Sequence, residues 1–239
     1  MRLVAWNCCM ALHRKVDELM ALAPDVAVIS ECAEPHIVAE KAPEFAPNSA
    51  LWIGDYIHKG LGVFTFNGYG AALAEVHNPS IRLIAPVCVT GPATFNLLAV
   101  WVQLGGHRKA EPGPMIRSLD AYGDFLGERS AVAAGDLNNH VLWDKPGYAA
   151  NHANAVEQFH NLGMTSAYHA DRGVAQGDET KPTHYWRDRT KHGPTYHIDY
   201  IFMPRDWVAG LREMIVGGFE HWSGRGLSDH VPLVIDIDL

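Results

Sequence analysis

The spacing of apolar residues at the start of the chain predicts a strand, a helix and a second strand. Residues 2–6 and 26–29 are short apolar runs, each typical of a buried strand. Between them, apolar residues recur at helical intervals over positions 12–22. Two polar residues, Asn7 and Glu31, lie just beyond the ends of the two predicted strands.

The middle of the chain has a pattern that predicts several strands followed by a helix. Apolar or alternating runs, separated by Gly, Pro and Asn, cover residues 61–66, 71–76, 81–89 and 94–104. Apolar positions then recur at helical spacing over residues 115–126, and the preceding Pro112 and Pro114 suit the start of a helix.

The last part of the chain continues this mixture of elements. An apolar run at 131–134 predicts a strand, and residues 151–162 predict a helix. Residues 171–194 are polar and predict a long loop, of the kind that often carries function. Further strands are expected at 197–203, 214–219 and 231–239. No repeat or linker interrupts the chain, so the sequence predicts one α+β domain covering residues 1–239.

The composition is that of a folded protein rather than of a nucleic-acid coat. The chain has 239 residues, 48% of them hydrophobic, and a formal net charge of -8. This hydrophobic content allows a buried core, whereas the negative charge argues against nonspecific coating of nucleic acid by Lys and Arg. A carboxylate-rich metal site is itself acidic, so an enzyme that handles phosphates is not excluded.

The cysteines and the apolar runs bear on where the protein works. The four cysteines form no CxxC pair, which argues against a thiolate zinc site. The first residues contain no apolar signal core, and no run is long enough to span a membrane. We therefore expect a cytoplasmic protein with free thiols, no membrane span and no obligate protein partner.

Polar residues recur where the predicted apolar strands stop. They are Asn7, Glu31, Asp136, Asn138, Asp199, Asp229 and His230. Carboxylate and amide oxygens are the ligands that Mg²⁺ and Mn²⁺ prefer, and such a cation stabilises charge on a phosphoryl oxygen. Taken singly, most of these residues also fit a turn or a solvated strand end. Asp199 is different, because an acid inside an apolar strand requires a partner or a metal.

The order of these residues along the chain resembles a known family. The segments are Trp6-Asn7, Ser30-Glu31, Gly135-Asp136-Leu137-Asn138, Ile198-Asp199-Tyr200 and Ser228-Asp229-His230. Together they resemble the endonuclease/exonuclease/phosphatase superfamily over residues 6–232, with the GDxN and SDH motifs as the most specific parts. The resemblance implies a DNase-I-like fold, a four-layer α/β/β/α sandwich with the site at one end.

The resemblance implies that the cofactor is a divalent metal, Mg²⁺ or Mn²⁺. By position, Glu31 corresponds to the principal metal ligand, with Asn7 nearby and Asp229 assisting. Cys9 stands two residues after Asn7, where some nuclease members carry an acid, and a thiol is a poor ligand for Mg²⁺. We therefore expect any second metal site to be weakened.

The resemblance also implies roles for four catalytic residues. Asp136 orients or deprotonates the attacking water, and Asn138 holds a phosphate oxygen or the nucleophile. His230 contacts the scissile phosphate and supports its developing charge, while Asp199 fixes the tautomer and orientation of His230. These roles imply in-line attack by water on phosphorus, without a covalent enzyme intermediate.

One strand departs from the pattern of the family. Many members carry a His or Tyr at the end of a central strand, where this chain has Trp101 or Gln103. The phosphate contact made by that residue is then missing, or is supplied by His107, His184 or Lys59.

The polar stretch from Lys181 to His197 interleaves basic and aromatic residues, which suits a phosphate backbone with stackable bases. It contains His184, Tyr185, Trp186, Arg187, Arg189, Lys191 and His192. A solvated loop with a tryptophan anchored in the core is the alternative interpretation. A zinc site requires a closed ligand set, and no HxxxH pair is present. The residues expected to bind substrate are Asn7, Trp101, Asn138, His184 and Arg187.

Three functions remain open at this point. The first is a Mg²⁺- or Mn²⁺-dependent nuclease that acts on DNA or RNA, favoured by the motifs and the basic-aromatic stretch. The second is a phosphatase or phosphodiesterase for a small molecule, nucleotide or lipid head group, favoured by the acidic charge and compact length. The third is a non-catalytic binding protein, favoured by Trp101 but opposed by the intact set of catalytic residues.

Overall fold

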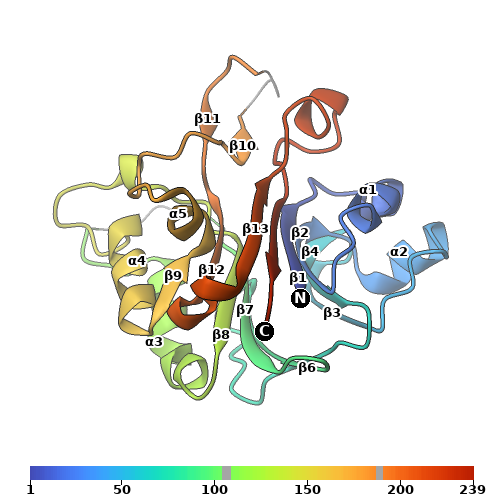
Figure 1. The fold of residues 1–239 in the computed structure, drawn as a ribbon, viewed down its shortest axis with the longest axis horizontal. Coiled ribbons are helices and arrows are strands. Elements are labelled where there is room, and N and C mark those ends of the chain that lie inside the picture. The colour runs from blue at the N-terminus through green and yellow to red at the C-terminus, as the bar shows by residue number, and fades with distance from the viewer. Residues whose placement is uncertain (104–108, 187–190) are drawn as a thin grey trace.

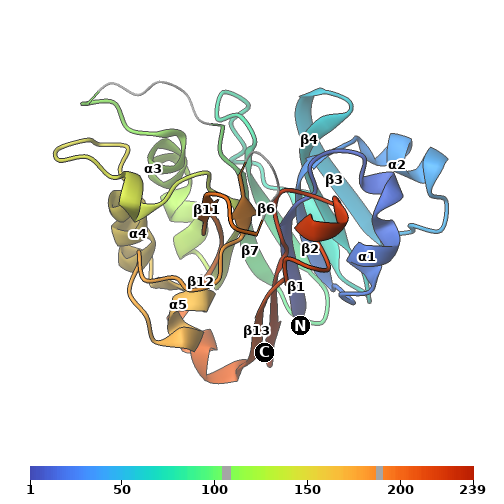
Figure 2. The ribbon, with the colours of Figure 1, turned by 90° about the horizontal axis from the view of Figure 1, so that it is seen from above.

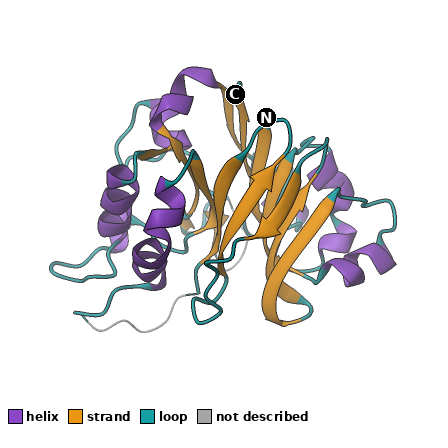
Figure 3. Ribbon diagram, turned by 90° about the horizontal axis from the view of Figure 1, so that it is seen from below, coloured by secondary structure: helices purple, strands orange, loops and turns teal. Residues whose placement is uncertain are grey.

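Two facing sheets form the centre of the molecule. The computed structural model describes residues 1–103, 109–186 and 191–239. Within these residues, two six-stranded sheets pack face to face, and helices lie on the outer flanks (Figure 1 and Figure 3). The predicted α+β class is confirmed, and the arrangement matches the expected α/β/β/α sandwich.

The first sheet carries the amino terminus of the chain. Its strands are β1 (Arg2–Asn7), β2 (Val26–Cys32), β3 (Ser49–Tyr56), β4 (Lys59–Thr65), β13 (Leu211–Val216) and β14 (Leu233–Ile237). Their order across the sheet is β13-β14-β1-β2-β4-β3. Because β1 and β2 are the parallel pair, both end at the same edge of the sheet.

The second sheet is built from the middle of the chain. Its strands are β5 (Gly70–Leu73), β6 (Ile84–Thr90), β7 (Phe95–Trp101), β8 (Ala131–Asp136), β9 (Met164–Ser166) and β12 (Asp199–Pro204). Their order is β5-β6-β7-β8-β12-β9, with β7 and β8 parallel. A separate small hairpin pairs β10 (His184–Tyr185) with β11 (Thr195–Tyr196).

The helices divide between the two flanks, as the view from above shows (Figure 2). They are α1 (Val16–Met20), α2 (Pro35–Lys41), α3 (Pro114–Gly127), α4 (His152–Asn161) and α5 (Ala167–Arg172). The first two pack on the first sheet, and α3 and α4 pack on the second. No helix within the described ranges has the length and apolar character needed to cross a membrane.

The continuous apolar run of β1 is explained by burial on both faces. Leu3 and Ala5 face the core between the two sheets, whereas Val4 and Trp6 face the layer of α1 and α2. Successive side chains of a strand point to opposite faces, so a strand covered on both sides has no polar alternation. Three apolar layers result, one between the sheets and one under the helices on each flank, and their packing fixes the positions of the strand ends.

Two regions differ from the predicted elements in the first half of the chain. The helix predicted over 12–22 is a 3-10 turn (Leu12–Arg14) followed by α1, because Lys15 has a non-helical φ of −136°. Between residues 33 and 58, where no element was predicted, the chain forms α2 and β3. The strand β3 lies at a sheet edge and is partly exposed, so it lacks apolar alternation.

The second half also differs in detail. The loop predicted over 171–194 contains the end of α5 and the strand β10, which are too short to produce a periodic pattern. The strand predicted at 214–219 begins earlier, as β13. The helix predicted over 115–126 is confirmed as α3, which has proline at its first position.

Candidate active site

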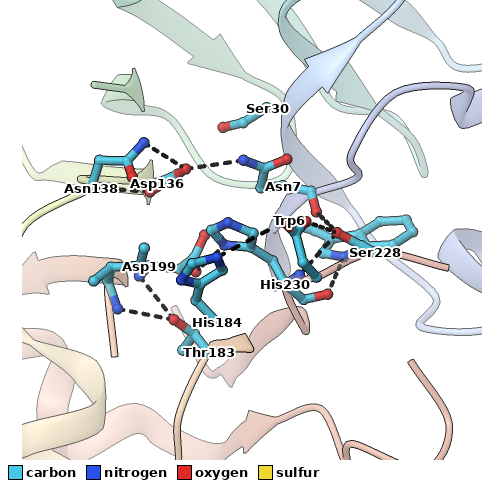
Figure 4. Close-up of polar contacts among 12 residues, drawn as sticks. Trp6, Asn7, Ser30, Asp136, Asn138, Thr183, His184, Asp199, Ser228 and His230 are labelled. Atoms are coloured by element: carbon cyan, nitrogen blue, oxygen red, sulfur yellow. Dashed lines mark hydrogen bonds and ion pairs between the residues drawn. The ribbon is translucent and has the colours of Figure 1, made fainter. Parts of the chain in front are cut away.

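The ends of four strands bring the predicted polar residues together. On the first sheet, Asn7 at the end of β1 lies opposite Ser30. On the second, Asp136 at the end of β8 lies opposite both Trp101 and Asp199. Asn7 reaches across between the sheets, and its Nδ2 donates to Asp136 Oδ2 at 3.0 Å (Figure 4). The sheet-to-sheet packing therefore assembles the site.

Glu31 is positioned by a β-bulge. Where β2 pairs with β4, Ser30 lies opposite Leu61 and Cys32 lies opposite Gly60, so Glu31 is the extra residue. Its φ of 60° is in the left-handed region, which few non-glycine residues adopt. Bulges of this kind re-aim a side chain beside a site, and an observed backbone outlier is a marker of a functional position.

In the Gly-Asp-Leu-Asn motif, the glycine and the asparagine both have a structural reason for their position next to Asp136. Gly135 has a φ of 137°, and a Cβ there would lie 1.9 Å from the carbonyl oxygen of Val100, so only glycine fits. Asn138 donates to Asp136 from its backbone N–H at 2.8 Å and from Nδ2 at 3.1 Å. Its Nδ2 also donates to the Val102 carbonyl at 2.9 Å. The asparagine thus fixes the carboxylate of Asp136.

The buried position of Asp136 changes its acidity. Burial, reinforced by the nearby carboxylate of Asp199, raises the pKa of Asp136 to about 7. A carboxyl group whose pKa lies near neutrality takes up and releases protons at physiological pH, which suits a general base.

Asp199 and His230 form a buried pair beside Asp136. His230 Nδ1 donates to Asp199 Oδ2 at 2.8 Å. Asp199 is itself held by Thr183, whose Oγ1 accepts from the N–H groups of Ile198 and Asp199 at 3.0 Å each. Burial alone would lower the pKa of His230, but the carboxylates of Asp199 and Asp136 overcome it and raise that pKa to about 10. His230 is therefore an imidazolium at neutral pH.

The backbone of His230 is tied to the first sheet. The Ser228 hydroxyl donates to the Asn7 carbonyl at 2.7 Å and accepts from the His230 N–H at 3.0 Å. The indole of Trp6 donates to the His230 carbonyl at 3.2 Å. The Ser-Asp-His motif thus joins the last strand of the chain to the first one, which explains why its serine is part of the pattern.

Asp229 and His184 lie on the other side of His230. His184 Nε2 is 3.8 Å from Asp229 Oδ2, and the rings of His184 and His230 are 4.4 Å apart. Burial alone would raise the pKa of Asp229, but the nearby imidazoles of His184 and His230 hold it well below its usual range. The structure therefore brings His184, predicted to bind substrate, next to the predicted phosphate-contacting residue.

Two groups of side chains in the described residues have ligand atoms close enough to hold a metal ion. They are His184, Asp229 and His230, and Asp136, Asp199 and His230. Both groups include His230, whose positive charge opposes the binding of a cation. Glu31 belongs to neither group; its carboxylate lies 3.1 Å from Lys59 Nζ and offers the hard oxygen ligands that Mg²⁺ and Mn²⁺ prefer. We therefore regard Glu31 as the better anchor for a divalent cation.

Asn7 has a less direct relation to such a cation. Its Oδ1 accepts from the Cys9 N–H at 3.0 Å, so Nδ2 is the atom that faces Asp136 and, at 3.4 Å, Glu31. In this orientation Asn7 positions the two carboxylates, and the amide has to turn over before its oxygen can act as a ligand.

The remaining predicted residues have varied positions. Trp101 is buried, with 4% of its surface exposed, and Lys59 Nζ lies 5.4 Å from the centre of its ring. Arg187 and His107, proposed for substrate and phosphate contacts, fall outside the described residues. The residue of the site that the sequence did not single out is Thr183, since a lone hydroxyl residue carries no pattern of its own.

The comparisons with known proteins bear on the fold. No family model matches the chain, and no curated protein sequence matches it. An AP endonuclease from Archaeoglobus fulgidus has a TM-score of 0.71 at 15% identity, and the match covers 100% of both chains. A 3'-5' exonuclease (NExo) from Neisseria meningitidis has a TM-score of 0.69 at 16% identity, also over 100% of both chains.

A third solved structure is an endonuclease/exonuclease/phosphatase from Beutenbergia cavernae. It has a TM-score of 0.62 at 18% identity, covering 100% of this chain and 71% of that one. At these identities the likeness establishes a shared fold. It confirms the DNase-I-like fold that the ordered motifs predicted.

Proposed function

We propose that this protein is a metal-dependent phosphoesterase that hydrolyses phosphodiester bonds of DNA or RNA. One observation carries the proposal: the carboxylate of Asp136 lies beside the buried imidazole of His230, whose Nδ1 is 2.8 Å from Asp199 Oδ2. A base for water and a fixed positive charge for phosphate are the two elements that in-line hydrolysis requires.

Asp136 acts on the nucleophile in this mechanism. Its two oxygens accept hydrogen bonds from Asn7 and Asn138, which fix the carboxylate at the junction of the sheets. Deprotonated Asp136 accepts a proton from the attacking water, and Asn138 orients the water or a phosphate oxygen. The pKa of about 7 matches the proton affinity of the base to neutral conditions.

His230 acts on the phosphate. The carboxylate of Asp199 keeps the proton on Nδ1, so the ring presents its other edge to a phosphoryl oxygen as a charged donor. The positive charge stabilises the negative charge that develops in the transition state, because the site is buried and preorganised. A divalent cation at Glu31, Mg²⁺ or Mn²⁺, would supply further stabilisation of that charge as a Lewis acid. Asp229 is proposed to assist in holding it.

Exposed aromatic residues near the site favour a nucleic acid as the substrate. Trp143 follows the Asp136 motif by a few residues and is exposed, with its ring 4.8 Å from that of Tyr196. Trp186 is exposed next to the small hairpin of His184. Aromatic rings around a phosphate site suit stacking with successive bases. The names of the structural neighbours, an AP endonuclease and a 3'-5' exonuclease, agree with this class of substrate.

A cavity beside the site favours the second candidate, a phosphatase or phosphodiesterase for a nucleotide or other small molecule. It has a volume of about 380 Å³ and is lined by residues that include Leu137, Asn139, Trp143, Lys145 and Tyr148. Pockets of this size accept small ligands. We also propose that the protein works in the cytoplasm, because its four cysteines form no disulfide, as is usual in reducing compartments.

Purified protein tests both candidates in one set of assays. Supercoiled DNA, single-stranded DNA, RNA and a series of nucleotides and phosphomonoesters are incubated with Mg²⁺ or Mn²⁺, and with EDTA as the control. We expect metal-dependent cleavage of a nucleic acid that EDTA abolishes. Cleavage of small phosphoesters alone would favour the second candidate, and no hydrolysis of any of these substrates would refute the proposal.

A further inference from the structure

A cationic side chain, Lys59, lies between Glu31 on the first sheet and Trp101 on the second. It begins β4, and its Nζ lies 3.1 Å from Glu31 Oε2 on the first sheet. The same ammonium lies 5.4 Å from the ring centre of Trp101 on the second sheet. Trp101, at the end of β7, is paired in register with Asp136, the proposed base. The ammonium of Lys59 therefore lies near the strand ends that carry the site.

This placement is built into the local fold. The bulge at Glu31 turns its carboxylate out of the ladder between β2 and β4. Lys59 is the first residue of β4, the strand next to β2. Trp52 packs against Gly60, where a Cβ would lie 2.3 Å from the indole, and donates to the Cys32 carbonyl at 3.1 Å. The backbone next to Lys59 is therefore held in place by the packing of Trp52.

The contacts of Lys59 contribute little to stability and leave its positive charge available to a ligand. Its side chain is 37% exposed, and exposed ion pairs contribute little to stability. The face of the Trp101 indole attracts a cation but, unlike a carboxylate, does not neutralise it. An ammonium also carries several donors and is a suitable point charge for a phosphate.

We propose that Lys59 is a phosphate-contacting residue, which exchanges its partner Glu31 for a non-bridging oxygen of the substrate. This inference rests on the proposed phosphoesterase function. In the free protein Lys59 neutralises Glu31 and competes with a divalent cation for that carboxylate. When the cation holds Glu31, the ammonium stays near the site on the ring of Trp101 and binds the phosphate. Lys59 thereby supplies the phosphate contact that a His or Tyr makes in other members of the superfamily and that Trp101 does not make here.

Lys59→Met tests this exchange with two independent measurements. Without substrate, Mn²⁺ binding is titrated by electron paramagnetic resonance, and we expect about tenfold tighter binding, because a positive charge near Glu31 is removed. On DNA, we expect kcat/KM to fall about tenfold. The slope of log kcat/KM against log salt becomes shallower by about one, as expected for one lost phosphate contact.

Matched variants separate the role of Lys59 from a general effect of charge. Arg212→Met removes a cation that pairs with Asp238 at the opposite end of the first sheet, and we expect it to behave as the wild type in both measurements. Lys59→Arg keeps the positive charge and is expected to bind Mn²⁺ as weakly as the wild type. Lys59→Gln serves as a second neutral variant if Lys59→Met does not fold.

The two measurements distinguish the failure of this inference from the failure of the proposed function. The Mn²⁺ titration requires no turnover, so a wild type without activity refutes the function, while tighter binding by Lys59→Met still supports the competition at Glu31. An active wild type whose Mn²⁺ affinity equals that of Lys59→Met overturns the role of Lys59 alone. A wild type that binds no Mn²⁺ overturns it too.

Discussion

Two buried clusters of histidine and carboxylate differ in their balance of charge. At the candidate active site, one imidazole, His230, faces the carboxylates of Asp136 and Asp199. In the second cluster, one carboxylate, Glu179, bridges two imidazoles. Its Oε2 is 3.0 Å from His140 Nε2, and its Oε1 is 2.9 Å from His169 Nε2.

The pKa shifts in the second cluster are opposite in direction to those at the candidate active site. Burial alone would raise the pKa of Glu179, but the hydrogen bonds with His140 and His169 hold it well below its usual range. Two adjacent histidines, His152 and His197, have their pKa lowered to about 4, chiefly by burial. These two rings are therefore neutral at physiological pH, whereas His230 is charged.

The comparison shows that burial lowers the pKa of a histidine unless adjacent carboxylates outweigh it, as Asp199 and Asp136 do at His230. An excess of carboxylate keeps a proton on His230, where a phosphate can use it. Burial leaves His152 and His197 neutral, because the single carboxylate of Glu179 offsets it only in part, and the hydrogen bonds of Glu179 make the second cluster a structural clamp. That clamp anchors the segment that leads to Thr183, which in turn holds Asp199.

The largest expected effect comes from removing the charge that maintains His230. In Asp199→Asn, the imidazole loses its buried carboxylate, so less of it is protonated and it stabilises the transition state less. We expect kcat on the cleaved phosphoester to fall by at least about a hundredfold. Circular dichroism checks that the variant is folded. A kcat within twofold of the wild type would show that the charge of His230 is not needed.

The matching change in the second cluster is Glu179→Gln, which should affect stability instead of rate. The change removes the buried carboxylate that bonds both imidazoles; at about 1.5 kcal/mol for each hydrogen bond to a charged group, we expect the free energy of unfolding to fall by about 3 kcal/mol. Urea denaturation measures this change. The rate per folded molecule should remain within about twofold of the wild type, and a large loss of rate without a loss of stability would reverse the comparison.

Much of the site was predictable because its residues follow buried strands. The apolar runs before Asn7 and Asp136, and the acid within the strand at Asp199, identify strand ends where a site is assembled. The bulge at Glu31 was not predictable, because it depends on pairing with β4, a strand distant in sequence. The clamp at Glu179 was also missed, because it lies in a polar stretch without periodicity, and its partners come from other elements.

A further effect, of about 2 kcal/mol for each of two histidines, concerns pH. In the unfolded chain, His152 and His197 bind protons near pH 6.5, whereas in the folded protein they do so only near pH 4. Stability is therefore full above about pH 7 and falls as the pH decreases toward 4, by about 2 kcal/mol for each residue at pH 5. Urea denaturation between pH 7 and 5 measures the slope. His152→Gln should reduce it, and an equal slope in both proteins would count against the neutral state of His152.

The smallest expected effect is that of Ser228→Ala. The variant loses the hydroxyl that joins the Asn7 carbonyl to the His230 N–H, two neutral hydrogen bonds. We expect a loss of about 1 kcal/mol in the free energy of unfolding and only a few-fold loss of rate. Urea denaturation and kcat measured together check this expectation. A rate loss as large as that of Asp199→Asn would place the control of His230 in its backbone rather than in its charge.

The most direct test of the central claim is the single-turnover rate of phosphoester cleavage in Asp136→Ala, His230→Ala and the double variant. If Asp136 is the base and His230 the charged group at the phosphate, each single variant loses at least about a hundredfold in rate. The double variant should lose much less than the product of the two, because the residues act as one unit. Rates equal to that of the wild type in all three variants would contradict the account.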